Sequence, residues 1–103
     1  DYVFGPDVAA ANLKAFTAEV PGGFLPFNIG TGLKTDVNQL EAQVRAAMQP
    51  HVARRGRPDL LPAPHHGPPR AGDLRSSVID AGRAGKILGW KPSVSLAEGI
   101  QKT

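Results

Sequence analysis

The chain has 103 residues, enough for one small domain with a thin hydrophobic core. Hydrophobic residues make up 41% and charged residues 20%, so the composition is that of a globular protein and not of a disordered one. The absence of cysteine excludes disulfides, thiolate metal sites and cysteine nucleophiles, and it favours a reducing, cytoplasmic setting. No apolar run is long enough to cross a membrane, so we expect no membrane partner.

The 12 glycines and 10 prolines predict a loop-rich fold. Met48 is the only methionine, so Asp1 is not a natural start, and we expect a fragment or a processed product. The net charge is +3, and its positive part lies between residues 45 and 75. Arginine-rich surface attracts phosphate, but a solvated loop explains the same charge. The arginines of this segment are Arg45, Arg54, Arg55, Arg57, Arg70 and Arg75.

Two elements are predicted before residue 24. Residues 2–4 are β-prone and are followed by a Gly-Pro pair, which predicts a short strand. From Asp7 onward, apolar residues recur at the spacing of one helical turn, so we predict a helix with Asp7 as its N-cap. The run Pro21-Gly22-Gly23 is predicted to end that helix.

A second strand and a second helix follow. Residues 24–29 are the second predicted strand, interrupted by Pro26. The Gly-Thr-Gly run at 30–32 is then a tight turn, and Thr35 is predicted to cap a helix that ends at Pro50. The apolar stripe of this helix consists of Val37, Leu40, Val44, Ala47 and Met48.

The second half of the chain predicts one long loop and two further helices. Six of the prolines fall in residues 50–69, which we interpret as an extended loop with one short strand at 60–61. A helix is predicted over residues 80–88 with Gly89 as its C-terminal cap, and Ser95 with Glu98 forms a capping box that begins the last helix. The predicted fold class is therefore α/β, with a few short strands, three to four helices and a Pro-rich loop.

Most common site chemistries are absent from this pattern. The run at 30–32 lacks the third glycine of a dinucleotide-binding loop, so a structural turn is the favoured interpretation. Tyr2 is the only tyrosine, and Pro6 stands where the lysine of a Tyr-x-x-x-Lys pair would be, so we predict no catalytic residue and no cofactor-binding residue. We also predict no metal site, because the three histidines have no further ligands at recognised spacings. Nucleic acid is not an expected partner, since the basic segment lacks aromatic residues for base stacking.

Three stretches share one order and spacing with a known family. They are residues 1–13, which begin Asp-Tyr-Val-Phe, residues 27–38, which contain Phe-Asn-Ile-Gly-Thr-Gly, and residues 69–99, which contain Pro-Arg-Ala-Gly-Asp and Leu-Gly-Trp-Lys-Pro. Together they resemble the carboxy-terminal third of the NAD-dependent sugar-nucleotide epimerases and dehydratases of the extended short-chain dehydrogenase/reductase family. One departure is Gly5-Pro6-Asp7, where the family usually has Val-x-Asp.

The resemblance implies that residues 1–103 are a sugar-nucleotide-binding carboxy-terminal portion and that the amino-terminal Rossmann domain is absent. NAD is then the cofactor of the parent enzyme and is not bound by this chain alone, which we expect to be inactive. Packing against a Rossmann domain implies an exposed apolar face, so we expect the isolated chain to be marginally stable or to self-associate. The family's dimers imply a homodimeric parent that forms through the absent part.

Within the family, the resemblance favours the 4-epimerases that interconvert UDP-glucose and UDP-galactose, with a UDP-sugar as the partner of this portion. Two alternatives stay open. One is the same portion of a dTDP-glucose 4,6-dehydratase or another sugar-nucleotide-modifying enzyme. The other is a non-catalytic fragment with no ligand of its own.

Arg70 and Asp73 are the predicted substrate-binding residues. The resemblance implies that this arginine contacts the diphosphate and that this acid contacts the ribose. Their chemistry agrees, because a guanidinium can hold two phosphate oxygens and a carboxylate can accept from both ribose hydroxyls. The alternative is a surface ion pair between Arg70 and Asp73 with no functional meaning.

Overall fold

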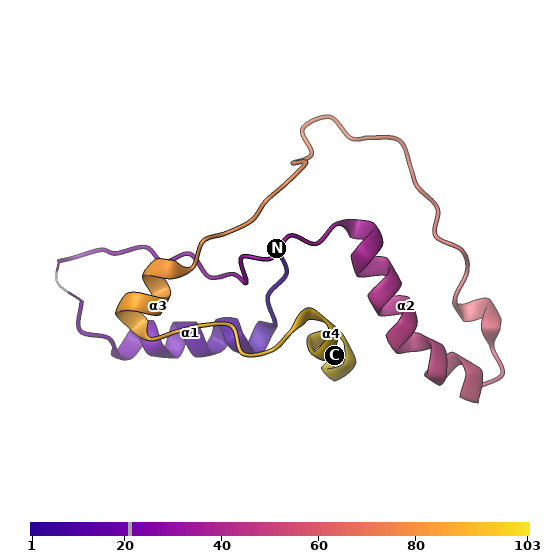
Figure 1. Ribbon diagram of the computed structural model, residues 1–103, viewed down its shortest axis with the longest axis horizontal. Coiled ribbons are helices and arrows are strands. Elements are labelled where there is room, and N and C mark those ends of the chain that lie inside the picture. The colour runs from indigo at the N-terminus through magenta and orange to yellow at the C-terminus, as the bar shows by residue number, and fades with distance from the viewer. Residues whose placement is uncertain (21) are drawn as a thin grey trace.

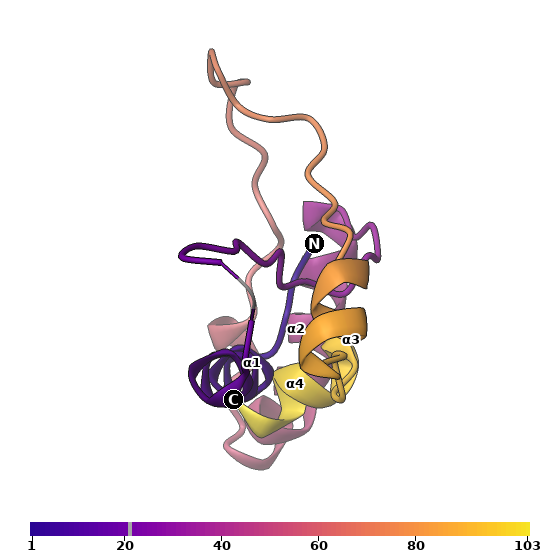
Figure 2. The same ribbon diagram turned by 90° about the vertical axis from the view of Figure 1, so that its left-hand side faces the viewer.

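The computed structural model describes residues 1–20 and 22–103, and these residues form four α-helices and one 3-10 turn (Figure 1). A long loop of residues 61–81 arches from the 3-10 turn to the third helix, and in the view turned by 90° it extends away from the helices (Figure 2). The elements are α1 (Gly5–Thr17), α2 (Val37–Arg54), η1 (Pro58–Leu60), α3 (Gly82–Leu88) and α4 (Leu96–Lys102).

The molecule is open and flat, with extents of 56 × 36 × 17 Å. Its radius of gyration is 17.7 Å, against about 13 Å for a compact domain of this length. It exposes 8171 Å², whereas a compact monomer of this mass exposes about 5,500 Å². Phe16 and Phe24 are 89% and 87% exposed. Large apolar side chains are therefore exposed, while a single apolar face that packs against a Rossmann domain stays a prediction.

The predicted α/β class is wrong, because the described residues contain no strand. Residues 2–4 and 24–29 have no regular secondary structure and no backbone ladder to a neighbour, and Pro26 has no N–H to donate to one. The strand predicted at 60–61 is also wrong, since the amide of Leu60 donates to the Arg57 carbonyl at 3.1 Å and closes η1.

Helix α1 begins earlier than predicted, with Phe4 as its N-cap and Pro6 in its first turn, where the missing N–H costs nothing. The predicted N-cap role of Asp7 is wrong, because Asp7 lies inside the first turn and is buried. The helix ends at Thr17, before the predicted stop, and Pro21 of that stop lies outside the described residues.

The carboxylate of Asp7 holds α1 to the segment before α4. It accepts hydrogen bonds from the Ser93 amide at 2.9 Å, the Ser93 hydroxyl at 2.5 Å and the Val94 amide at 3.1 Å. The Ser93 hydroxyl is the main reason why the pKa of Asp7 lies below its ordinary value, and these bonds outweigh the opposing effect of burial.

The core lies where α3 packs on α1, and it consists of Ala11, Ala84, Leu88 and Trp90. The indole Nε1 of Trp90 donates to the carbonyl of Asp7 at 2.8 Å. The predicted cap at Gly89 is confirmed: its φ is +59°, and its amide donates to the Ala84 carbonyl, as does the amide of Trp90. This turn folds Trp90 back onto the helix that precedes it.

Helix α2 contacts α4 and η1. Its N-cap is Asp36 in a capping box with Gln39, so the predicted cap at Thr35 is wrong by one residue. Pro50 does not end the helix, which continues through the buried Val52 to Arg54. The capping box predicted at Ser95 and Glu98 is confirmed and begins α4. None of the helices in the described residues is both long and apolar enough to cross a membrane.

Candidate functional site

Arg70 and Asp73 stand at the two ends of one exposed turn in the 61–81 loop. The amide of Asp73 donates to the Arg70 carbonyl at 3.4 Å. Gly72 has a φ of +88°, a conformation that glycine adopts without steric cost. The turn therefore presents a guanidinium and a carboxylate to solvent at positions three residues apart.

The alternative of an ion pair between these two residues is not realised. Within the residues that the structure describes, neither side chain takes part in an ion pair. A ligand that bound Arg70 and Asp73 would therefore displace no internal contact between them.

The end of the loop is fixed by Asp1. Its carboxylate accepts from the Thr31 amide at 2.9 Å, the Thr31 hydroxyl at 2.6 Å and the Ile79 amide at 3.3 Å. The amino group of Asp1 donates to the Ser77 carbonyl at 2.9 Å. These bonds join the loop to the turn at 30–32 across a wide sequence separation.

A polar cavity of about 370 Å³ lies beside this junction, next to the part of the loop that follows the Arg70–Asp73 turn. Lys34 and Arg75 bring two positive charges to its lining, Ser76 and Ser77 bring hydroxyl groups, and the carboxylates of Asp1 and Asp36 line it as well. Cations with neighbouring hydroxyl donors suit a phosphate oxygen. The sequence reasoning missed Lys34, because only the fold brings it near Arg75 and no motif surrounds it.

The Gly-Thr-Gly run at 30–32 is a structural turn, as predicted. The amides of Thr31 and Gly32 already donate to Asp1, so they do not present free donors to a phosphate. Gly32 has a φ of +73°, and a Cβ on Gly30 would lie 2.9 Å from the Asp1 carboxylate. The glycines are therefore required by the turn and by close packing.

The arginines of residues 45–75 do not gather into one patch. Arg57 forms an ion pair with Asp59 at 2.7 Å, and this contact holds the pKa of Asp59 below its ordinary value. Arg45 donates to backbone carbonyls of the loop, and Arg54 contacts His51 on its own helix. Several of these charges are thus engaged within the chain.

The histidines also lie apart. His66 Nε2 is 2.7 Å from the side-chain oxygen of Asn38, and His51 Nδ1 is 3.0 Å from Arg54. In the described part of the chain, no three His, Asp or Glu side chains are grouped as metal ligands would be.

Comparison with known proteins gives the strongest evidence of relationship. No protein-family model matches the chain. Over its whole length it is 44% identical to a Mycolicibacterium smegmatis protein named UDP-glucose 4-epimerase. Over 99% of its length it is 34% identical to a Methanocaldococcus jannaschii protein to which the same name is provisionally given. The resemblance to sugar-nucleotide epimerases is confirmed.

The chain spans only 29% and 28% of the lengths of these two relatives. The similarity is therefore to a part of each relative.

Proposed function

We propose that this chain is the nucleotide-binding part of a UDP-glucose 4-epimerase of the extended short-chain dehydrogenase/reductase family. Arg70 holds the diphosphate of the sugar nucleotide and Asp73 accepts from the ribose hydroxyls. The observation that carries the proposal is the exposed turn that presents both side chains with no ion pair between them. The similarity to proteins named UDP-glucose 4-epimerase supports the choice of ligand.

The chemistry of the loop suits this role. The planar guanidinium of Arg70 can donate two parallel hydrogen bonds to phosphate oxygens, which a lysine cannot do. Lys34 and Arg75 lie in the lining of the neighbouring cavity and can add positive charge near a diphosphate held by Arg70, although Asp1 and Asp36 share that lining. Prolines limit the conformations that the loop loses when a ligand binds.

The residues of this chain do not fit NAD, the cofactor of the proposed parent enzyme. The amides of Thr31 and Gly32 are bound by Asp1, and the sequence has no dinucleotide-binding glycine pattern. Tyr2, the single tyrosine, has Pro6 four residues later and not a lysine. We therefore propose that this chain binds substrate and supplies no group to the hydride transfer. The lack of cysteine agrees with a cytoplasmic enzyme.

The proposal is tested by titrating the 103-residue chain with UDP, followed by calorimetry and by amide chemical shifts. Arg70→Ala should weaken UDP binding by about 1.5–3 kcal/mol, the usual contribution of a charge-assisted hydrogen bond. Arg55→Ala is the matched control, because it removes an exposed arginine outside the loop. Titration with NAD should give no saturable change.

Two outcomes would overturn the proposal. One is the absence of saturable UDP binding by the wild-type chain. The other is binding that Arg70→Ala leaves as tight as in the wild type and in Arg55→Ala.

A further inference from the structure

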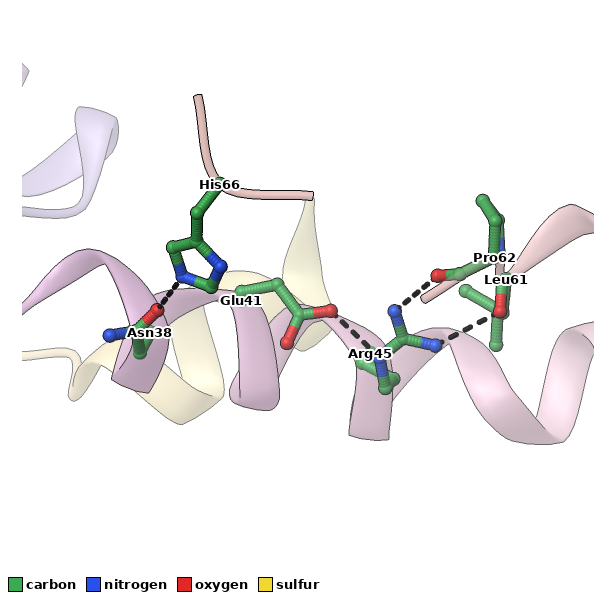
Figure 3. A network of polar contacts seen from close by, with 6 residues as sticks. All are labelled: Asn38, Glu41, Arg45, Leu61, Pro62 and His66. Carbon is green, nitrogen blue, oxygen red and sulfur yellow. Dashed lines mark hydrogen bonds and ion pairs between the residues drawn. The ribbon is translucent and has the colours of Figure 1, made fainter. Parts of the chain in front are cut away.

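Arg45 fastens the start of the 61–81 loop to the side of α2 (Figure 3). Its guanidinium donates to the Leu61 carbonyl at 3.0 Å and to the Pro62 carbonyl at 2.5 Å. Its Nε donates to the carboxylate of Glu41, one helical turn earlier, at 2.7 Å. Glu41 therefore orients the guanidinium, and its nitrogens Nη1 and Nη2 donate to the loop.

A second contact lies further along the same helix face. His66 Nε2 is 2.7 Å from the Asn38 side-chain oxygen and donates to it when that nitrogen carries the proton (Figure 3). Asn38, Glu41 and Arg45 follow each other at spacings of three and four residues, which puts them on one side of α2. The loop thus runs back along α2 from Leu61 to His66.

Prolines stiffen the loop between these contacts and again just before Arg70, with Gly67 between the two stretches. Pro62 and Pro64 fix their own φ angles and restrict the residues before them, and Pro68 and Pro69 do the same ahead of Arg70. A Pro-rich segment behaves as a semi-rigid spacer, so its direction at one end persists for several residues. Holding Leu61 and Pro62 in place therefore directs the segment that leads to Arg70.

The far end of the loop is held as well. Asp1 binds the Ser77 carbonyl and the Ile79 amide. With both ends fastened, residues 67–76 are left without such contacts to the helices, and this stretch contains Arg70 and Asp73. The contacts at the two ends thus enclose the turn that carries the proposed nucleotide-binding side chains.

We propose that Arg45 is a positioning residue for nucleotide binding: by binding the Leu61 and Pro62 carbonyls, it sets where the Arg70–Asp73 turn lies. The inference rests on the proposed function, and it assigns a role to a residue that touches no substrate. Arg45 lowers the entropy that the loop must lose on binding, because the loop is already shortened and directed in the free protein.

The size of the effect follows from chain statistics. If the single exposed contact between His66 and Asn38 is lost together with the bonds of Arg45, the free part of the loop lengthens from residues 67–76 to residues 61–76, which weakens binding by about twofold through closure entropy alone. Any released residue that must be ordered again adds about fivefold or more. We therefore expect Arg45→Ala to weaken UDP binding by about two- to tenfold.

The position of the loop is measured first, without any ligand. Because the chain has no cysteine, Ala42→Cys on α2 and Ala71→Cys in the turn give two unique sites for spin labels. Arg45→Ala should broaden the distribution of distances between the two labels, and Arg45→Lys should restore it only in part, since lysine lacks the planar fork. Arg54→Ala is the matched control, because this arginine lies on the same helix and, among the residues that the structure describes, its side chain bonds to His51 and not to the loop. An unchanged distribution in Arg45→Ala overturns the inference.

The second measurement is UDP affinity of the unlabelled chain. Weaker binding in Arg45→Ala, partial recovery in Arg45→Lys and wild-type binding in Arg54→Ala support the positioning role. Wild-type affinity in Arg45→Ala overturns that role and leaves the proposed function standing. Absence of UDP binding by the wild-type chain overturns the proposed function itself, and with it the role of Arg45.

Discussion

The end of the molecule where α1 meets α3 and the loop of residues 61–81 are held by different forces. The first combines buried side chains with long-range hydrogen bonds, of which the bond from Trp90 to the Asp7 carbonyl is an example. The second contains no buried residue and is held at its ends by side chains of Arg45 and Asp1. Substitutions in the first region should therefore change stability, and those in the second should change ligand binding.

Trp90→Ala should have the largest effect on stability. Trp90 is 2% exposed and sits in a core of very few residues, so its truncation should cost about 3–5 kcal/mol and abolish cooperative unfolding. Urea titrations followed by circular dichroism measure this. Trp90→Phe loses the bond to the Asp7 carbonyl but keeps an aromatic ring in the core. It should therefore destabilise the protein less than Trp90→Ala does. Equal urea midpoints for Trp90→Ala and the wild type would contradict this account of the core.

Asp7→Asn should have the next largest effect, about 1.5–3 kcal/mol at pH 7, because it weakens charge-assisted bonds from Ser93 and Val94. The pKa of Asp7 is lower in the folded state than its ordinary value near 4. Its contribution is therefore fully present above pH 4 and is lost as the pH falls through the folded-state pKa.

The pH dependence of stability separates the contribution of Asp7 from that of other carboxylates. Urea midpoints of the wild type and of Asp7→Asn, measured from pH 7 to pH 2, should approach each other below pH 4. Glu98, whose pKa is also lowered by its bonds to Ser95, is present in both proteins and affects both curves alike. A gap that stays constant across this range would be evidence against an ionised Asp7 as the stabilising group.

The smallest expected changes in stability come from alanine substitutions at two glycines, Gly30 and Gly67. Gly30→Ala should cost about 1–2 kcal/mol, because the new Cβ would lie 2.9 Å from the Asp1 carboxylate and 3.1 Å from Ile79 Cβ. Gly67→Ala, in the loop, has nothing within 4 Å of the new Cβ and should be neutral or slightly stabilising through the unfolded state. Thermal melts of both variants measure the difference. Equal melting temperatures would show that the junction at Asp1 is looser than described.

Local signals in the sequence predicted the end of α3 and the start of α4 correctly, but they failed at Asp7, Thr35 and Pro50. The capping box at Ser95 and Glu98 and the cap at Gly89 depend on residues within one or two turns, and both are confirmed. The strands failed, because an extended segment becomes a strand only when a neighbour pairs with it, and that neighbour is not a local property. The sequence predicted that Asp7 belongs to the start of α1, but not what it binds. Its partners Ser93 and Val94 are far away in sequence, so no local pattern indicates them.

In the candidate site, too, residues within a short motif could be predicted and residues brought together only by the fold could not. Arg70 and Asp73 were predicted from a short motif, and the structure places both on one exposed turn; their binding role stays a prediction. Lys34 near the cavity and Arg45 under the loop could not be predicted. Arg45 contacts residues 16 and 17 positions away, and no short pattern encodes such an approach.

The bond from Trp90 to the Asp7 carbonyl joins residues 83 positions apart, and this has a consequence during synthesis. A ribosome adds about 5–20 residues per second, so α1 is made roughly 4–17 s before the indole that covers it exists. For that time the apolar side of α1, including Ala11, has no intramolecular partner from α3. That side of α1 therefore stays open to other partners until Trp90 can reach it.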